Sequence, residues 1–333
     1  MTVRSSPIVV ITGASAGVGR ATAVAFARRG YNVGLIARGH DGLEGARHDV
    51  EAAGGRALVL PVDVADADSV FAAADQVVSE WGQIDVWINA AMATIFAPVN
   101  DIKPDEFRRV TEVTYLGQVY GTMAALQHMR QSNRGTIVQV GSALSYRAIP
   151  LQSAYCGAKF AIRGFTDALR SELKHDKSRV RLTMVQLPAV NTPQFDWARS
   201  RLPKRLQPVP PIFQPAAIAR EIFRAAREAP RELWIGRSAL KAIIGTMLLP
   251  RLGDRILAHE GYDGQMTAEP AAPDLPDNLF QPVSGDPGPR GRFDDESSNK
   301  VIGFNPAWIR VGVACALLGL VAGAAALSGS RRV

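Results

Sequence analysis

Short apolar runs alternate with amphipathic stretches along the first 236 residues of the chain. The run Ile8-Val-Val-Ile-Thr12 has the composition of a strand that is buried on both faces of a sheet. Further strands are predicted at residues 31–37, 57–62, 84–89, 136–141, 180–187 and 232–235. Helices are predicted at residues 20–29, 41–53, 66–81, 113–129, 155–175 and 215–228, and one more helix is predicted to start near residue 104. This alternation predicts an α/β fold, a doubly wound parallel sheet with right-handed crossovers.

A glycine-rich turn separates the first predicted strand from the first helix. Its sequence is Gly13-Ala-Ser-Ala-Gly17-Val-Gly19, with the spacing G-x-x-x-G-x-G. In the order strand, turn, helix, such glycines let the backbone approach a pyrophosphate, and the helix N-terminus favours its negative charge. The turn is weak evidence alone, and its context favours a phosphate site.

The second and third strands end at residues that suit a nucleotide. Arg38 follows the second strand, where an acidic residue would accept from a ribose 2′-hydroxyl and an arginine would pair with a 2′-phosphate. The alternative is a solvated arginine on a loop. Asp63 follows the third strand, within reach of an adenine edge. Arg38 favours NADP over NAD.

Tyr155 and Lys159 are spaced to lie on one face of a helix, one turn apart. An ammonium beside a phenol lowers a pKa that is ordinarily about 10, and the phenol becomes a usable acid or base near neutral pH. Ser142 ends the preceding strand and can hold a substrate oxygen. By itself this spacing is more typical of a solvated helix face, so its context decides.

Composition limits the other functions. The net charge is +7, but its basic residues are not interleaved with aromatics along one stripe, so no nucleic-acid partner is predicted. The two cysteines, Cys156 and Cys315, indicate a reducing compartment, and no metal site is predicted because the histidines and cysteines lack ligand spacing. The apolar run at residues 8–11 is too short for a signal peptide, so we expect a cytoplasmic catalytic domain.

Together these motifs resemble the short-chain dehydrogenase/reductase family, whose fold is Rossmann-like. The matching pieces occur in the family's order and cover about residues 7–236: Thr12-Gly-Ala-Ser-Ala-Gly-Val-Gly19, Asp63-Val64, Ile88-Asn-Ala-Ala91, Gly141-Ser142, Tyr155-x-x-x-Lys159 and Pro188-Ala-Val-Asn-Thr192. The resemblance implies that Tyr155 is the general acid/base, that Lys159 lowers its pKa and binds the nicotinamide ribose, and that Ser142 orients the substrate oxygen. It also implies dinucleotide binding by Gly13, Ser15, Gly17, Val18, Gly19, Arg38, Asp63, Asn89, Tyr155, Lys159 and Thr192.

The chain departs from the family pattern at the proton relay. The family often has an active-site asparagine where this chain has Thr114, whose hydroxyl can hold a water but cannot replace an amide in full. Asn89 is followed by Ala90-Ala91-Met92, which lacks the second asparagine and the closing glycine of the family. We therefore keep two hypotheses. The first is an NADP(H)-dependent oxidoreductase that interconverts a carbonyl and an alcohol on a small, lipophilic substrate; the second is a weakly active or inactive nucleotide-binding scaffold or sensor.

The chain is predicted to consist of a catalytic domain (1–260), a linker (261–300) and a hydrophobic tail (301–333). Residues 194–215 are predicted to form a substrate lid or a disordered loop, and residues 237–260 a pair of short helices over the pocket or a basic amphipathic surface at a membrane. Residues 261–300 are rich in proline, glycine and acids and predict a flexible linker. Residues 311–330 carry no charge and are long enough for a transmembrane helix that would anchor the protein. The sequence does not determine whether the protein forms a homo-oligomer.

Overall fold

The computed structural model describes residues 6–272 and 275–308. The predicted transmembrane segment 311–330 lies outside the described residues. None of the helices formed by the described residues combines the length and the apolar character needed to cross a bilayer.

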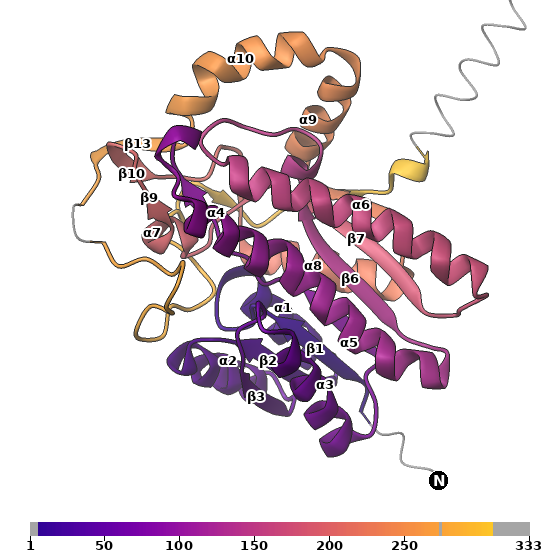
Figure 1. Ribbon diagram of the computed structural model, residues 1–333. Helices are drawn as coiled ribbons and strands as arrows, with labels where there is room; N and C mark the ends of the chain where they lie inside the picture. The colour runs from indigo at the N-terminus through magenta and orange to yellow at the C-terminus, as the bar shows by residue number, and fades with distance from the viewer. Residues whose placement is uncertain (1–5, 273–274, 309–333) are drawn as a thin grey trace, which may run out of the picture.

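An eight-stranded sheet forms the centre of the molecule (Figure 1), with the strand order β15-β12-β7-β6-β4-β1-β2-β3. All neighbouring strands are parallel except β15, which pairs antiparallel with β12. The strands are β1 Ile8–Thr12, β2 Asn32–Ala37, β3 Ala57–Pro61, β4 Val86–Asn89, β6 Thr136–Ser142, β7 Arg181–Leu187, β12 Glu232–Ile235 and β15 Gly303–Phe304. The predicted doubly wound sheet is therefore confirmed, and β1 and β6 are buried along their whole length, as their apolar runs predict.

Helices cover both faces of this sheet. One core cluster joins the sheet to α1, α2 and α8, and another joins it to α3, α5 and α6. The helices are α1 Gly17–Ala27, α2 His40–Ala52, α3 Ala67–Trp81, α4 Pro104–Thr111, α5 Gly117–Ser132, α6 Ser153–His175 and α8 Pro215–Glu228. Because parallel strands run between these layers, their carboxyl ends meet at one edge.

The helix predicted at residues 113–129 differs from the prediction at its start. Residues Glu112–Leu116 form a π-helical turn between α4 and α5. Turns of this kind occur mostly as single insertions in helices, frequently at functional sites. Thr114 lies within this turn.

Short strands order the segment that was predicted to be a lid or a disordered loop. Residues 194–215 contain α7 (Gln194–Trp197) and the strands β9 Arg199–Ser200, β10 Lys204–Leu206 and β11 Ile212–Phe213. Their partners are β5 Ile95–Phe96 for β9, β13 Met266–Pro270 for β10, and β8 Ala189–Val190 and β14 Ser297–Ser298 for β11. The disordered alternative is therefore wrong.

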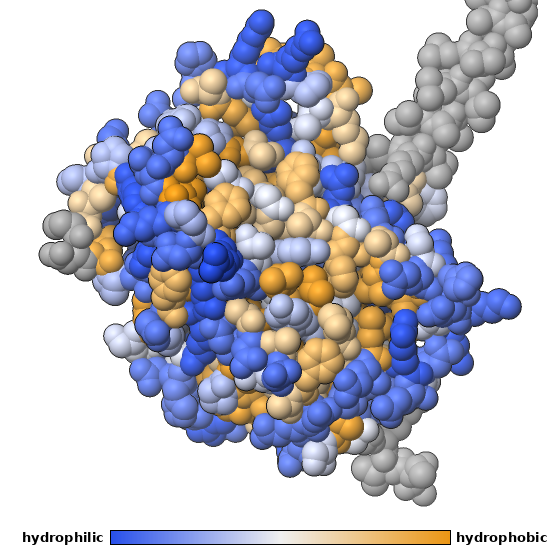
Figure 2. Space-filling view, in the orientation of Figure 1, coloured by the Kyte–Doolittle hydropathy of each residue, from blue (hydrophilic) through white to orange (hydrophobic). Residues whose placement is uncertain are grey.

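The two predicted short helices after β12 are present as α9 Arg237–Leu248 and α10 Pro250–Asp263. They form an arch over the rest of the molecule (Figure 1). Apolar side chains are exposed on this arch beside basic ones (Figure 2), and the exposed apolar residues are Met247, Leu248, Leu249, Leu252, Ile256 and Tyr262.

The segment predicted to be a flexible linker, residues 261–300, is instead held against the catalytic domain in its described part. Two apolar side chains, Leu279 and Phe293, are buried there, and β13 and β14 pair with the ordered lid segment. The composition misleads because most other contacts of this segment join its main chain or carboxylates to arginines far away in sequence, such as Arg38 and Arg20. A window that measures only local hydrophobicity cannot detect such partners.

Candidate active site

A cavity of about 520 Å³ opens at the carboxyl edge of the sheet. Most of the predicted site residues line it: Gly13, Ser15, Gly17, Val18, Gly19, Arg38, Asp63, Ser142, Tyr155, Lys159 and Thr192. The loops that carry them follow β1, β2, β3, β6 and β7, and α6 adds Tyr155 and Lys159. The cavity thus joins the glycine turn to the serine, tyrosine and lysine.

The glycine turn is shaped by close contacts with neighbouring main chain. Gly13 has a φ of +72°, and a Cβ there would lie 2.8 Å from the Cα of Ala91. A Cβ on Gly19 would collide with the carbonyl of Gly13. The hydroxyl of Thr12 fixes the turn against the next strand by accepting 3.1 Å hydrogen bonds from the amides of Ala90 and Ala91. The compact turn leaves the N-terminus of α1 facing the cavity, as a bound pyrophosphate requires.

Ser142 and Tyr155 meet on the other side of the cavity. Ser142 ends β6 and caps a short 3₁₀ turn, Ala143–Ser145, by accepting a 3.1 Å hydrogen bond from the amide of Leu144. Burial raises the pKa of the Tyr155 phenol above its usual range, and a hydrogen bond from the Ser142 hydroxyl opposes this shift. Tyr155 is therefore protonated near neutral pH.

Lys159 is buried one turn beyond Tyr155. Its ammonium lies 5.4 Å from the centroid of the Tyr155 ring and donates a 2.7 Å hydrogen bond to the carbonyl of Val140. Burial lowers the pKa of Lys159 to about 7. The expectation that Lys159 lowers the pKa of Tyr155 is not met in this arrangement, because desolvation dominates the pKa of both groups.

The side chain of Thr114 is engaged with main chain, and its predicted catalytic role stays a prediction. It is fully buried, and its hydroxyl accepts a 2.9 Å hydrogen bond from the amide of Ala93 and donates one of 2.8 Å to the Ala93 carbonyl. The neighbouring Val113 lines the cavity, whereas Thr114 does not. The spacing predicted the position along the helix correctly, but it could not indicate which way the hydroxyl points.

Asn89 is also turned away from the cavity. Its side-chain amide donates to Gln118, Thr122 and Gln139 over 3.0–3.2 Å, and its oxygen accepts a 2.8 Å hydrogen bond from Trp87. These hydrogen bonds of the Asn89 side chain connect β4 to α5 and β6. The predicted contact between the Asn89 side chain and a dinucleotide is therefore not supported, although Ala90, Ala91 and Met92 after it do line the cavity.

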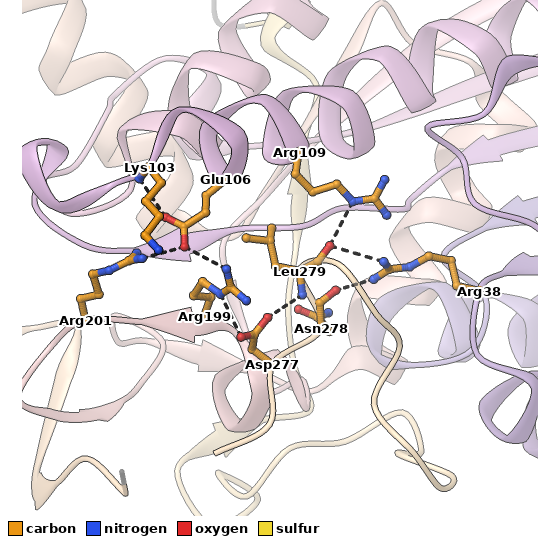
Figure 3. Close-up of polar contacts among 9 residues, drawn as sticks. All are labelled: Arg38, Lys103, Glu106, Arg109, Arg199, Arg201, Asp277, Asn278 and Leu279. Carbon is orange, nitrogen blue, oxygen red and sulfur yellow. Dashed lines mark hydrogen bonds and ion pairs between the residues drawn. The ribbon is translucent and has the colours of Figure 1, made fainter. Parts of the chain in front are cut away.

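Arg38 and Asp63 occupy the opposite end of the cavity from Tyr155, and both contact groups that sequence reasoning missed. The Arg38 guanidinium donates to the carbonyls of Asn278 and Leu279 (Figure 3), and to that of Phe280 over 2.9 Å. Asp63 forms a 2.5 Å ion pair with Arg109 of α4. Burial lowers the pKa of Arg38, the charge of Arg109 adds to this shift, and Asp63 opposes it. No sequence signal marks Arg109, because its position near the cavity depends on the packing of α4.

The walls beyond Tyr155 are mainly apolar and were not predicted residue by residue. They come from the loop before α6, from the lid segment and from the α9–α10 arch: Ile149, Phe195, Trp197, Val209, Ala239, Ala242 and Leu257. Polar groups here are few. Gln152 donates a 2.7 Å hydrogen bond to the side chain of Gln265 between α6 and the end of the arch.

Comparison with known proteins decides the family. The family model described as short chain dehydrogenase matches residues 7–202. The chain belongs to the short-chain dehydrogenase/reductase family. It is 32% identical over 270 residues to the oxidoreductase YxnA of Bacillus subtilis, a match that covers 80% of this chain and 75% of the relative. It is 36% identical over 170 residues to human dehydrogenase/reductase SDR family member 7, with half of each chain covered.

A solved structure agrees with this assignment. The alcohol dehydrogenase of the archaeon Thermococcus sibiricus, in complex with 5-hydroxy-NADP, has a TM-score of 0.58 and 30% identity, and the match covers 68% of this chain and 95% of that one. This short-chain dehydrogenase/reductase is thus an oxidoreductase on a fold that binds a nicotinamide cofactor.

Proposed function

We propose that the protein is an NADP(H)-dependent oxidoreductase that interconverts a carbonyl and an alcohol on a lipophilic substrate. The observation that carries this proposal is the convergence of Ser142, Tyr155 and Lys159 in one cavity with the glycine turn at the N-terminus of α1. A proton donor, an orienting hydroxyl and a phosphate cradle in one space are the parts that carbonyl reduction needs.

The residues present fit the cofactor. The compact turn from Gly13 to Gly19, with Thr192 against Gly17, would hold the pyrophosphate, and Lys159 lines the cavity near Tyr155, where the nicotinamide ribose would lie. When bound, the cofactor supplies or accepts the hydride, and the protein has to orient the substrate and move one proton.

Tyr155 and Ser142 have separate tasks in this proposal. Because burial keeps the phenol protonated, Tyr155 is suited to donate its proton to a substrate carbonyl oxygen as that oxygen gains charge. The Ser142 hydroxyl, held at the end of β6, orients the same oxygen. Lys159, with a pKa of about 7, is close enough to stabilise the charge that remains on Tyr155 afterwards.

Charge at the far end of the cavity favours NADP over NAD. Arg38 and Arg109 converge there, and Asp63 is the carboxylate that pairs with Arg109. The main-chain carbonyls that contact Arg38 do not neutralise its charge. A 2′-phosphate would supply the missing negative charge in a partly buried place, where charge-assisted hydrogen bonds are strong.

The apolar walls favour a lipophilic substrate. Phe195, Trp197, Val209, Ala242 and Leu257 line the end of the cavity beyond Tyr155. Sites of this composition bind mainly through apolar area, with a few polar groups to fix orientation.

The full-length protein tests the proposal in a screen of aldehydes, ketones and alcohols with NADPH, NADH and their oxidised forms, with Tyr155→Phe as the control. We expect NADPH oxidation with apolar carbonyl compounds and its loss in Tyr155→Phe. Turnover that the Tyr155→Phe variant retains would contradict the proposed role.

The scaffold alternative is favoured by one observation, the engagement of Thr114 with Ala93, which leaves its hydroxyl no part in a proton relay. Tight NADPH binding without turnover on the whole screen would favour that alternative.

Membrane attachment through residues 311–330 of a cytoplasmic catalytic domain remains a prediction from the sequence. The exposed apolar residues of the α9–α10 arch are compatible with it, because Lys241, Arg251 and Arg255 accompany them on the same helices. Fractionation tests this prediction: a full-length protein that stays in the soluble fraction without detergent would contradict it.

A further inference from the structure

Residues 277–288, which we call the strap, run across the cleft that holds the glycine turn. Five of them line the same cavity as that turn: Asn278, Pro282, Val283, Gly285 and Pro287. The strap therefore forms a wall of the proposed dinucleotide site, opposite the sheet edge that the family motifs mark.

The first end of the strap is firmly anchored. Leu279 is fully buried in the core cluster that contains α3 and α5, and its carbonyl accepts hydrogen bonds from both Arg38 and Arg109 (Figure 3). Asp277 accepts a 2.8 Å hydrogen bond from Arg199 and one of 2.9 Å from the amide of Leu279. These contacts join the strap to α4, to the lid segment and to the end of β2.

Arg199 is itself held by a buried carboxylate. Glu106 of α4 pairs with Arg199 at 2.8 Å and with Arg201 at 2.6 Å. Burial acts to raise the pKa of Glu106, yet hydrogen bonds from Arg201, the Lys103 amide and Arg199 lower it to about 2. Glu106 is therefore ionised at all ordinary pH values, and this end of the strap stays in place.

The second end of the strap is held by polar contacts of strap residues that are not themselves buried. Asp286 pairs with Arg20 of α1, and the amide of Gly285 donates a 3.0 Å hydrogen bond to Asp41. The side chain of Asp286 is 45% exposed whereas that of Arg20 is 5% exposed, so solvent reaches this pair from the strap side only. Between the two ends lie Pro282 and Gly285, and no residue of 281–288 is buried. Segment 281–288 can therefore separate from the rest of the domain without exposing buried residues of its own.

A main-chain carbonyl of the strap accepts a hydrogen bond from an N–H group that a dinucleotide phosphate would use. The amide of Gly17, at the first position of α1, donates to the carbonyl of Gly288 over 3.3 Å. Within the strap, Arg38 contacts carbonyls of the anchored residues 278–280, so these hydrogen bonds are kept when segment 281–288 moves. A phosphate oxygen and a carbonyl oxygen are both acceptors, so they compete for one N–H, and the charged acceptor forms the stronger bond. The carbonyl of Gly288 must therefore move away from the Gly17 amide where a phosphate binds.

From this competition we propose that the strap gates cofactor exchange. Its segment 281–288 swings away from α1 and α2 to admit NADP(H), then closes over the adenosine half, with the Arg20–Asp286 pair as its latch. The proposal rests on the proposed function, and it adds a segment beyond the matched family region 7–202 to the binding site.

A reversible cross-link tests the gate. A Cβ on residue 45 of α2 would lie 2.5 Å from the Cγ of Asp286, so cysteines at these two positions are close enough for a disulfide. The double variant Gly45→Cys/Asp286→Cys is made with Cys315→Ser, since Cys156 is buried. Stopped-flow fluorescence then follows NADPH association and release in the oxidised and the reduced protein, with the Cys315→Ser single variant under the same oxidant as the control.

We expect the oxidised double variant to bind and release NADPH at least about tenfold more slowly than its reduced form, because loop opening limits exchange. Equal rate constants in both forms, with the cross-link verified by intact mass, would overturn the proposal.

A second variant covers the case in which the double variant does not fold. Asp286→Asn opens the latch and should raise the association and release rate constants several-fold, while Asp295→Asn, an exposed carboxylate beyond the strap, should leave them unchanged. Unchanged rate constants in Asp286→Asn would also overturn the gate. A wild-type protein that binds neither NADPH nor NADH would remove the proposed function itself, whereas binding without these rate effects removes the strap proposal alone.

Discussion

The ammonium of Lys159 lies 5.4 Å from the centroid of the Tyr155 ring, one helical turn along α6, and both groups are shaped by burial more than by each other. Burial keeps the phenol protonated and brings the lysine pKa down to about 7. The pair thus combines a protonated acid with a cation that is readily neutralised.

Replacing Lys159 with methionine should stabilise the protein while it removes activity. The pKa of Lys159 is about 7 in the folded protein and ordinarily about 10.4. Burying its charge therefore lowers the free energy of unfolding by the full amount below pH 7, and this cost fades as the pH rises toward 10. The carbonyl of Val140 keeps a partner, because Gln118 also donates to it. We expect Lys159→Met to gain about 1–3 kcal/mol at pH 6 and less at pH 9 by urea unfolding. An equal gain at both pH values would contradict the lowered pKa.

Thr114 should matter for stability and little for catalysis. Its hydroxyl bonds only to the main chain of Ala93 among the described residues. Thr114→Val should therefore cost about 1–3 kcal/mol in free energy of unfolding, because two buried main-chain groups lose a partner. Thr114→Ser should restore that stability. A fall of kcat by a hundredfold in Thr114→Val, with normal folding, would instead place Thr114 in a proton relay.

Arg38 should select the cofactor. Arg38→Asp removes the charge that would face a 2′-phosphate, so we expect the KM for NADPH to rise about 10- to 100-fold and the KM for NADH to change far less. Arg56→Asp, on an exposed arginine that pairs with Glu80, is the matched control. Unchanged NADPH affinity in Arg38→Asp would show that Arg38 serves the strap only.

Glu106 should anchor the lid and the strap in a pH-dependent manner. Its pKa of about 2 in the folded protein lies below the ordinary value of about 4.3. The contribution of ionised Glu106 to the free energy of unfolding is therefore present above pH 4.3 and is lost as the pH falls toward 2. Glu106→Gln should cost about 2–3 kcal/mol at pH 7 and progressively less below pH 4. Denaturant titrations at pH 7, 4 and 3 measure this, and a cost independent of pH would contradict the ion-pair account.

Comparison of the sequence predictions with the structure shows where local patterns suffice. The strand at residues 232–235 and the helix at 215–228 were predicted with the observed bounds, because an apolar run and a helical period are local properties. The glycine turn and the Tyr155–Lys159 pair were placed for the same reason. Thr114 and Asn89 do not line the cavity, and spacing could not indicate this because it does not fix the direction of a side chain. The strap was missed because Arg38 and Arg109 hold its main chain, and no composition signal records such partners.

The central claim is that Tyr155 supplies the proton for carbonyl reduction. The most direct test is single-turnover reduction by the NADPH-loaded protein, with the wild type and Tyr155→Phe compared on one apolar carbonyl substrate. The account predicts that Tyr155→Phe binds NADPH with wild-type affinity and that its rate of reduction falls by about 10²–10⁴-fold. A Tyr155→Phe variant that folds, binds NADPH and reduces the substrate within threefold of the wild-type rate would contradict it.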